Sequence, residues 1–385
     1  MVDFLKEVLL WLAGIWFLWF PAILCLFFYK TWISRTRAYF LKNLSWTLLE
    51  IKIPRDIVKS PKAMETVLMS LYSKPSGSWW KNVTKGTVPI WYSLEIAGIN
   101  GGVHFFVYVQ KDLRNLVESQ VYAQFSDAEI SEVSDYTYGS DFENSNNWEI
   151  WASEFKLEKE DGYPIKTYVD FGLDETGPDE EQKVNPLVSF LEFLGSLKEG
   201  EQAWFQIIIK GADKKWVDDG NKLVGELMGR NKSEEDQKSN KLSKGEQEVV
   251  SAIEKNISKA GFETGIRAVY VARKDVFNPV NKASILGSMN HYNTYNLNGF
   301  KPSVGISPKP LGFLFKKKRE ARNKIAMLEA YRERGYFYAP HSRDSFVFNT
   351  EELATLFHFP GRVAEVPTFA RIESRKSEPP PTLPI

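Results

Sequence analysis

One uninterrupted apolar segment dominates the hydrophobic pattern of the chain, close to the amino end. It covers residues 8–29, VLLWLAGIWFLWFPAILCLFFY, and contains no charged side chain. As a helix rising about 1.5 Å per residue it would span roughly 33 Å, which matches a bilayer core of about 30 Å. A secretory signal peptide is the alternative, but its apolar region is only about 7–15 residues long and no small-residue cleavage motif follows here. The pattern therefore predicts a retained transmembrane anchor, residues 1–34, with a tolerated kink at Pro21.

The charges that flank this segment predict its orientation. Two acidic residues and one lysine precede it, whereas Lys30, Arg35, Arg37 and Lys42 follow it. The positive-inside bias then places the carboxyl-terminal side in the cytoplasm. We expect a single-pass protein of the inner cell membrane with the bulk of the chain cytoplasmic. Its membrane-interface residues would be Lys30, Trp32, Arg35 and Arg37.

Residues 35–75 are predicted to form a juxtamembrane helical linker. Its first part, 35–49, mixes basic and aromatic residues and would lie along the membrane surface or form an ordinary linker helix. Within 53–73, a turn precedes a helix in which Ser60 is the cap and Pro61 the first helical residue. The apolar face of that helix is formed by Met64, Val67, Leu68 and Leu71.

Residues 76–175 have the pattern of a small α+β module. Strands are predicted over residues 90–99, 103–109, 128–136, 148–156 and 163–169. Asn100-Gly101 separates the first two strands and is a strong type I′ hairpin signal. Asp112 caps a helix that follows the hairpin. The order of two strands, a helix and a strand is part of a ferredoxin-like unit.

Residues 176–305 repeat this alternation, which predicts a second α+β module. Helices are predicted over residues 185–197, 216–228, 246–259 and 279–291, and strands over 203–210 and 264–273. Residues 229–245, GRNKSEEDQKSNKLSKG, have few apolar anchors and are expected to form a mobile loop. The predicted fold class is α+β: one transmembrane helix, two small ferredoxin-like modules and a helical carboxyl-terminal segment with a Pro-rich tail.

The carboxyl-terminal segment is predicted to cover residues 306–361 and to end in a short helix. Asn349 caps this helix and Glu352 completes a capping box, while Pro360-Gly361 ends it. Residues 362–385 follow as an extended tail that contains EPPPTLPI. Three consecutive prolines favour a semi-stiff polyproline II conformation.

Composition excludes some classes of protein. Lys+Arg and Asp+Glu both number 49, so no global electrostatic attraction to nucleic acid follows, only local patches. Aromatic residues make up 14% of the chain, which argues against a mostly disordered protein. The single cysteine, Cys25, lies in the apolar segment, so no intrachain disulfide is possible.

Motifs of catalysis and metal binding are missing from the sequence. It contains no P-loop, G-x-S-x-G, H-E-x-x-H or C-x-x-C motif. His104 is expected to pack in a strand and His358 at a helix end, without ligand spacing. The sequence therefore predicts no catalytic residue, no cofactor and no metal site, and hence no enzyme. An undetected enzyme would need a concave site with convergent polar groups.

One stretch, residues 315–335, concentrates positive charge. Ala321, Ile325 and Leu328 lie on one helical stripe, which would dock on the body and leave the basic side chains outward, Arg332 and Arg334 included. The candidate contacts for phosphate, lipid headgroups or a partner are Lys316, Lys317, Lys318, Arg319, Arg322 and Lys324. The default interpretation of such a stretch is a solvated helix face, and the contact surface is the functional alternative.

Four segments carry a family resemblance and are spread over most of the chain after the anchor. They are LEIKIPRDIVKSPKAMETVL (49–68), WYSLEIAGINGGVHFFVYVQKDLRNLVESQVYAQFSDAEISEVSDY (91–136), YNLNGFKP (295–302) and FNTEELATLFHFPG (348–361). Together they resemble the membrane-anchored N-terminal region of type IV secretion or conjugative DNA-transfer proteins. These are the coupling-protein-like relatives of HerA/FtsK ATPases in small-genome bacteria. No single segment is a catalytic signature.

The resemblance implies a function as well as a location. A motor domain would follow a segment like RIESRKSEPPPTLP, and the phosphate-binding residues of such a motor have no counterpart in this sequence. The chain would then be a non-catalytic membrane subunit that docks a P-loop ATPase supplied by another chain, with DNA as the transported substrate and homo-oligomerisation into a ring. The alternative is a membrane-bound scaffold of envelope or pilus machinery with no DNA role.

Overall fold

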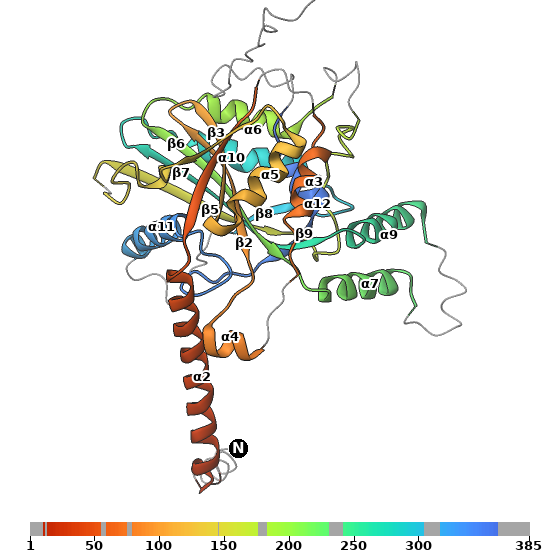
Figure 1. Cartoon of the computed structure of the whole chain (residues 1–385). Coiled ribbons are helices and arrows are strands. Elements are labelled where there is room, and N and C mark those ends of the chain that lie inside the picture. Colours follow the sequence, from red (N-terminus) through yellow and green to blue (C-terminus); the bar gives the residue numbers. More distant parts are fainter. Residues whose placement is uncertain are drawn as a thin grey trace, which may run out of the picture. The chain divides into compact units, whose positions relative to one another are not determined.

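The computed structural model describes residues 11, 14–54, 59–74, 79–144, 146–175, 183–230, 242–303 and 316–360, without the side chains of residue 79 and residues 316–321. The chain forms two compact units within this described part (Figure 1). The helical unit comprises Met1–Leu44 and Ser76–Pro89, and the sheet unit comprises Ser45–Pro75 and Ile90–Ile385. Each unit is described by itself.

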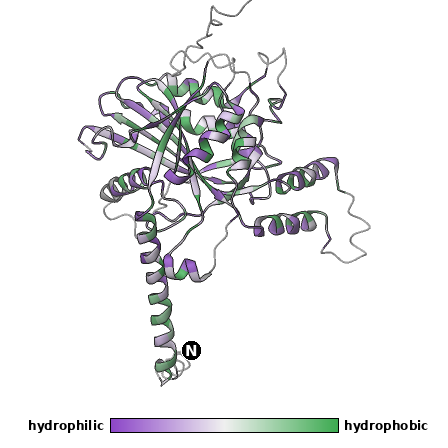
Figure 2. Ribbon diagram, viewed as in Figure 1, coloured by the Kyte–Doolittle hydropathy of each residue, from purple (hydrophilic) through white to green (hydrophobic). Residues whose placement is uncertain are grey.

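The helical unit contains, in its described residues, the long helix α2 (Trp16–Lys42) and the short helix α4 (Trp79–Lys85). None of the α2 side chains is buried. Figure 2 shows apolar residues around the amino-terminal half of this helix. From Trp16 onward the uncharged run thus forms the predicted helix, with Pro21 inside it, and the helix continues through the basic residues to Lys42.

The sheet unit is built on one sheet with nine strands among the described residues. The strand order is β4-β1-β3-β2-β6-β7-β5-β8, and β9 pairs with β7. These pairings are antiparallel. The strands are β1 (Trp46–Lys52), β2 (Trp91–Ile99), β3 (Gly102–Gln110), β4 (Glu129–Val133), β5 (Trp148–Leu157), β6 (Glu201–Gly211), β7 (Gly261–Arg273), β8 (Phe300–Ser303) and β9 (Phe346–Asn349).

The order of the first four strands recurs in the next four. From the outer edge inward each quartet runs fourth, first, third, second, which gives β4-β1-β3-β2 and β8-β5-β7-β6. The quartets meet at β2 and β6, in a register that extends from Trp91↔Lys210 to Ile99↔Gln202. The strands of both halves therefore form one continuous sheet.

Helices cover one face of this sheet. They are α3 (Lys62–Ser70), α5 (Arg114–Gln124), α6 (Pro186–Gly195), α10 (Val280–Met289) and α12 (Thr350–Leu356). Their apolar side chains form a large core with alternate strand residues such as Leu94, Phe105 and Ile207. The period of two along each strand sends the intervening residues to the opposite face.

The opposite face carries a smaller core. Helix α11 (Lys316–Arg332) contributes Leu328 and Tyr331, which are completely buried beside Phe106 and Trp204 of the sheet. The predicted docking of the α11 stripe is therefore confirmed at Leu328. A 3-10 turn, η2 (Tyr136–Tyr138), adds aromatic contacts on the same face.

A helical hairpin is inserted between β6 and β7. It consists of α7 (Lys215–Leu227) and α9 (Lys244–Ile257), which lie side by side in Figure 1. Val224 of α7 packs with Val250 and Ile253 of α9. Most of the loop expected over 229–245 lies outside the described residues, as do residues 304–315 and the tail from residue 361 onward.

Two predicted elements are wrong. The helical linker expected over 35–75 contains β1, whose residues are buried on both faces and so lack the alternation that signals a strand. Residues 163–169, predicted as a strand, form an irregular segment that ends in a turn. The N–H of Ile165 donates to the Glu352 side chain at 3.0 Å, and the N–H of Tyr168 donates to the Thr355 side chain at 2.9 Å. These donors therefore do not join the sheet.

Candidate functional site

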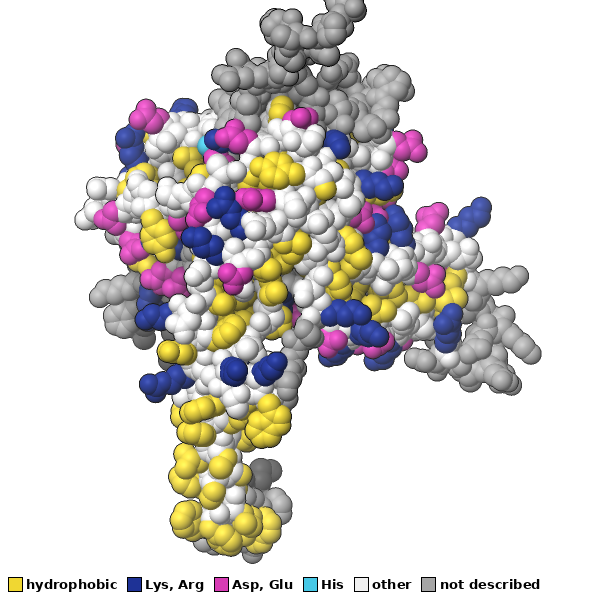
Figure 3. Space-filling view, viewed as in Figure 1, with side chains coloured by type: hydrophobic (Ala, Val, Ile, Leu, Met, Phe, Trp, Pro, Cys, Tyr) yellow, Lys and Arg dark blue, Asp and Glu magenta, His cyan; other side chains and the backbone are white. Residues whose placement is uncertain are grey.

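The expected membrane-interface residues all lie on α2. Lys30, Trp32 and Arg35 are exposed, and Arg37 is half-buried. Figure 3 shows apolar side chains covering the amino-terminal part of this helix, with basic side chains further along it. Among the described residues, α2 is the one helix long and apolar enough to cross a membrane.

The basic candidate residues lie on α11. Four of their side chains are outside the described part: Lys316, Lys317, Lys318 and Arg319. Arg322 is exposed, whereas Lys324 forms an ion pair with Glu149 of β5. Lys324, the last of the predicted contact residues, is therefore paired within the sheet unit.

Two further basic residues of this stretch are buried, which corrects the expectation that they point outward. Arg332 is 8% exposed, donates to Thr137 O at 3.1 Å and pairs with Glu143. Arg334, two residues after the end of α11, is 1% exposed. Helical periodicity does not reach Arg334, because the residue has a left-handed backbone, with φ of 48°, after the helix has ended.

Arg334 is held by a completely buried carboxylate, Glu95. Its Nε and Nη2 donate to the two Glu95 oxygens at 3.0 and 3.1 Å, a bidentate arrangement. Asp135 receives a second pair of hydrogen bonds from the same guanidinium. Burial works to raise the pKa of Asp135, but Arg334 outweighs it and the pKa is lowered. The hydroxyl of Tyr136 also donates to Glu95, at 2.9 Å.

Glu95 belongs to a polar row that crosses the sheet. Adjacent strands place four polar residues opposite one another, in the order Glu154, Arg267, Gln206 and Glu95. Their exposed fractions lie between 0 and 4%. Burial lowers the pKa of Arg267, although the negative charge of Glu154 opposes this effect. A buried charge is stable only when polar or charged groups pair with it, so the segment that covers the polar row must supply such groups.

The chain after α11 lies over this polar row, and we call its residues 333–345 the strap. Its contacts are Arg334 to Glu95, Gly335 O to Arg267 at 2.8 Å, and Arg343 to Glu154 at 3.2 Å. Tyr336 packs where Gly265 leaves room, because a Cβ at Gly265 would lie 2.3 Å from the Tyr336 ring. The polar row therefore holds the strap and offers little access to a substrate.

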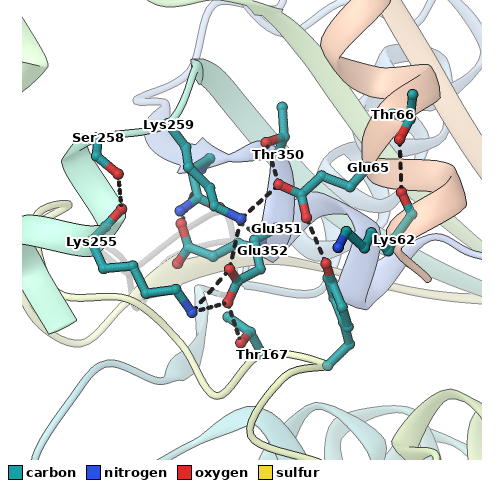
Figure 4. Close-up of polar contacts among 12 residues, drawn as sticks. Lys62, Glu65, Thr66, Thr167, Lys255, Ser258, Lys259, Thr350, Glu351 and Glu352 are labelled. Carbon is teal, nitrogen blue, oxygen red and sulfur yellow. Dashed lines mark hydrogen bonds and ion pairs between the residues drawn. The ribbon is translucent and has the colours of Figure 1, made fainter. Parts of the chain in front are cut away.

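A second polar cluster lines an open groove of about 810 Å³ between α3, α9 and α12, which we call the lysine–glutamate groove. Lys259 bridges Glu65 and Glu351, with both Nζ–O distances at 2.7 Å. Lys255 approaches Glu351 at 3.2 Å, and Tyr168 donates to Glu65 at 2.6 Å. Figure 4 shows these side chains converging from separate elements.

The charges of this groove balance one another. Burial acts to raise the pKa of Glu351, but its hydrogen bonds to Lys259 and Thr167 outweigh burial and lower the pKa. Burial acts to lower the pKa of Lys259, and the two carboxylates raise it. Both glutamates therefore face lysines, and the centre of the groove presents paired charges.

Glu352, next in sequence, has a different environment. It is completely buried, and in the described part of the chain its donors are the N–H groups of Asn349 and Ile165, at 3.0 Å each. Burial raises the pKa of Glu352 to about 8. The expected capping box of Asn349 and Glu352 is confirmed. His358 packs at the end of the same helix as predicted, and burial lowers its pKa to about 4.

Metal-binding geometry is not seen in the described residues, where no group of His, Cys, Asp or Glu residues could hold an ion. Sequence reasoning missed the polar row and the lysine–glutamate groove. One signal for the row existed, since Glu95, Gln206 and Arg267 each interrupt an otherwise apolar strand. The groove had none, because its residues come from segments up to 285 positions apart.

Comparison with known proteins identifies a family, and that family has no assigned function. Among curated proteins, none matches the chain in sequence. A family model described as a domain of unknown function (DUF8128) matches residues 30–371. The match begins directly after the uncharged segment and includes every strand described above. The chain therefore belongs to this family, the domain of unknown function DUF8128.

Proposed function

We propose that the chain is a membrane-anchored, non-catalytic assembly module of a type IV secretion- or conjugation-like DNA-translocation system. It would dock an ATPase supplied by another chain at the cytoplasmic face of the inner membrane, as a homo-oligomer. The observation that carries the proposal is α2, a helix of 27 residues with no buried side chain. The part of α2 up to Tyr29 carries no charged residue, and such an exposed apolar surface costs free energy in water and is favoured in lipid.

The proposal includes the finer architecture of the sheet unit. We infer that its two halves are two ferredoxin-like modules joined edge to edge through β2 and β6. The repeated strand order supports this, and so does the position of the helices between the first and second and between the third and fourth strands of each half. A doubled sheet of this kind offers a broad rigid surface for docking a partner.

One observation favours the second candidate function, a membrane-bound scaffold of envelope or pilus machinery without a DNA role. Lys324, Arg332 and Arg334 each pair with a carboxylate of the sheet unit. Their charge is thus neutralised, and less of the basic stretch remains for phosphate.

The anchoring part of the proposal is tested by charge in α2. Leu18→Lys together with Leu24→Lys places two cations in the apolar segment, at about 2.5–3.5 kcal/mol each near the helix centre. We expect the double variant to leave the membrane fraction after alkaline extraction, whereas the control, Leu18→Ile with Leu24→Ile, stays. Retention of both variants would refute anchoring by α2.

The motor-docking part is tested by mild cross-linking and detergent extraction of native membranes. A P-loop ATPase should co-purify with the full chain and be lost when the chain is absent. Recovery of lone monomers at every cross-linker concentration would contradict both the docking and the oligomer.

The DNA part is tested by glutamine substitution of Lys316, Lys317, Lys318 and Arg319. Each lost phosphate contact should reduce the slope of log affinity against log salt by about 0.9. The control variant carries glutamine at Lys214, Lys215, Lys222 and Lys244, which lie in or beside α7 and α9. Equal DNA binding by both variants would favour the scaffold.

A further inference from the structure

The short helix α4 lies next to the carboxyl-terminal part of α2 within the helical unit. The indole N–H of Trp32 donates to Val83 O at 2.9 Å and so joins the two helices. Directly after α4, Gly86 has a left-handed backbone with φ of +67°. A Cβ there would lie 2.4 Å from Thr36 O, so the chain passes against α2 in a way that only glycine permits.

The height of this contact along α2 can be compared with the thickness of a bilayer. The uncharged run ends at Tyr29. At about 1.5 Å per residue, Trp32 lies roughly 4.5 Å and Thr36 roughly 10 Å beyond that end. The polar headgroup layer adds about 5–8 Å on each side of the hydrocarbon core. Wherever α2 spans a bilayer, the Trp32–Val83 contact of α4 therefore lies at the level of the headgroups, and the Thr36–Gly86 contact after α4 lies just beyond it.

The composition of α4 suits that level. Trp80 is 66% exposed, and an amphipathic indole is favoured at a membrane interface. The residues of the helical unit beyond the uncharged run, 30–44 and 79–89, include no Asp or Glu. Their basic residues are Lys30, Arg35, Arg37, Lys42, Lys81 and Lys85. Each basic residue near an anionic surface contributes about 1 kcal/mol of attraction.

We propose that α4 is a second membrane-contacting element, which places Trp80 in the headgroup layer and binds anionic lipid headgroups through Lys81 and Lys85. Because α4 is held against α2, its contact with the headgroups limits the tilt and rotation of the anchor. The inference rests on the proposed function in one respect, the insertion of α2. We assign an anionic lipid surface as the partner of α4, because α4 lies against the anchor and its charged residues are all positive.

The test uses the full chain reconstituted into vesicles, with an environment-sensitive fluorophore on one cysteine at a time. Native Cys25, exposed on α2, reports insertion of the anchor. Trp80→Cys in a Cys25→Ser background reports α4, and Tyr295→Cys in the same background is an exposed aromatic control in the sheet unit. Quenchers are placed at the headgroup or deep in the acyl chains.

We expect acyl-chain quenching at Cys25, which lies about 6 Å inside the end of the uncharged run, headgroup-level quenching at Trp80→Cys, and little quenching at Tyr295→Cys. Quenching at Trp80→Cys should increase when phosphatidylglycerol is added to phosphatidylcholine vesicles. Lys81→Gln with Lys85→Gln should abolish that increase, whereas Lys214→Gln with Lys215→Gln should not.

The outcomes separate the two proposals. Quenching at Cys25 without quenching at Trp80→Cys overturns the inference about α4 and leaves anchoring intact. Equal quenching at Trp80→Cys and Tyr295→Cys also overturns it. Protection of Trp80→Cys from both the lipid quenchers and aqueous iodide would overturn it as well, because it would mean that a second copy of the chain covers α4. Failure of acyl-chain quenching at Cys25 refutes the anchor itself.

Discussion

At the scale of single residues, two buried glutamates have contrasting environments. Glu95 faces the guanidinium of Arg334, so a buried anion meets a buried cation with bidentate geometry. Glu352 meets backbone N–H groups, and in the described part of the chain no lysine or arginine pairs with it. The first setting pairs the carboxylate with a cation, whereas burial in the second raises the pKa of Glu352 and favours the neutral acid. Each setting leads to a different prediction.

Removal of the cation from the first setting should be costly. Arg334→Met leaves Glu95 buried without its cation, and breaking such a pair typically costs about 3–5 kcal/mol. We expect the free energy of unfolding, measured by denaturant titration of the detergent-solubilised chain, to fall by about this amount. The double variant Glu95→Gln with Arg334→Met should recover part of the loss. Equal loss in the single and double variants would show that Glu95 is not the reason.

Stability should decrease with rising pH because of Glu352. Its pKa is raised from 4.5 to about 8 in the folded chain, so the folded state keeps a proton that the unfolded state releases between these values. The stabilising contribution is therefore complete below pH 4.5 and lost as pH rises through about 8. Burial also raises the pKa of Asp161 to about 6 and lowers that of His358 from 6.5 to about 4. The contribution of Glu352 is therefore read as the difference between the wild type and a Glu352 variant over the same pH interval.

The measurement is the change in unfolding free energy between pH 6 and pH 8. Glu352→Gln should flatten this change, because the substituted side chain does not titrate. Glu351→Gln is the matched control, since the pKa of Glu351 is lowered and its titration occurs in acid. A wild-type slope in the Glu352→Gln variant would assign the proton elsewhere.

At the scale of elements, the α7–α9 hairpin depends on close approach of its two helices. Gly220 lies against Ile257, so a Cβ at Gly220 would be 2.5 Å from the Ile257 side chain. Gly225, on the same helix, has open space where a Cβ would be. The hairpin therefore contains two glycines with opposite roles, one required for packing and one that only weakens the helix.

Alanine at these two positions should have opposite effects. Gly225→Ala should stabilise α7 by about 0.5–1 kcal/mol, because alanine has a higher helix propensity than glycine. Gly220→Ala should destabilise the hairpin by about 1–3 kcal/mol, the usual cost of overpacking. Hydrogen exchange of the α7 and α9 amides measures both. Stabilisation by Gly220→Ala would show that α9 moves away without cost.

At the scale of the whole sheet unit, the β2–β6 pairing makes two halves into one sheet. Its register covers the full length of β2, and the polar row continues across it through Glu95 and Gln206. The large core likewise contains residues from both halves. We therefore expect the sheet unit to unfold cooperatively, with damage in one half transmitted to the other.

Ile96→Ala in β2 tests this cooperativity. Ile96 is completely buried, and truncation of such a residue costs about 2–5 kcal/mol. Hydrogen exchange should accelerate in β7 as much as in β3. Ile130→Ala in the edge strand β4, where the side chain is half-buried, should have a smaller effect everywhere. Protection of β7 that survives Ile96→Ala would indicate that the halves unfold separately.

The sequence by itself determined the elements whose signals are local. The described part of the uncharged run from Trp16 formed the first half of α2, Asn100-Gly101 formed the tight hairpin turn with positive φ at both residues, and the Asn349 capping box began α12. Each of these signals lies within about twenty residues and depends on solvation or backbone geometry that neighbours along the chain supply. DNA, ATPase and oligomer partners remain predictions.

Only the tertiary structure decided the rest. The polar row joins Glu95 to Gln206 and Arg267, and Arg334 reaches it from 239 positions away, so no local pattern contains the arrangement. β1 was missed for a related reason, because burial on both faces removes the polar alternation by which a strand is recognised. Register between distant strands is set by which side chains are buried together, and that is a property of the assembled sheet.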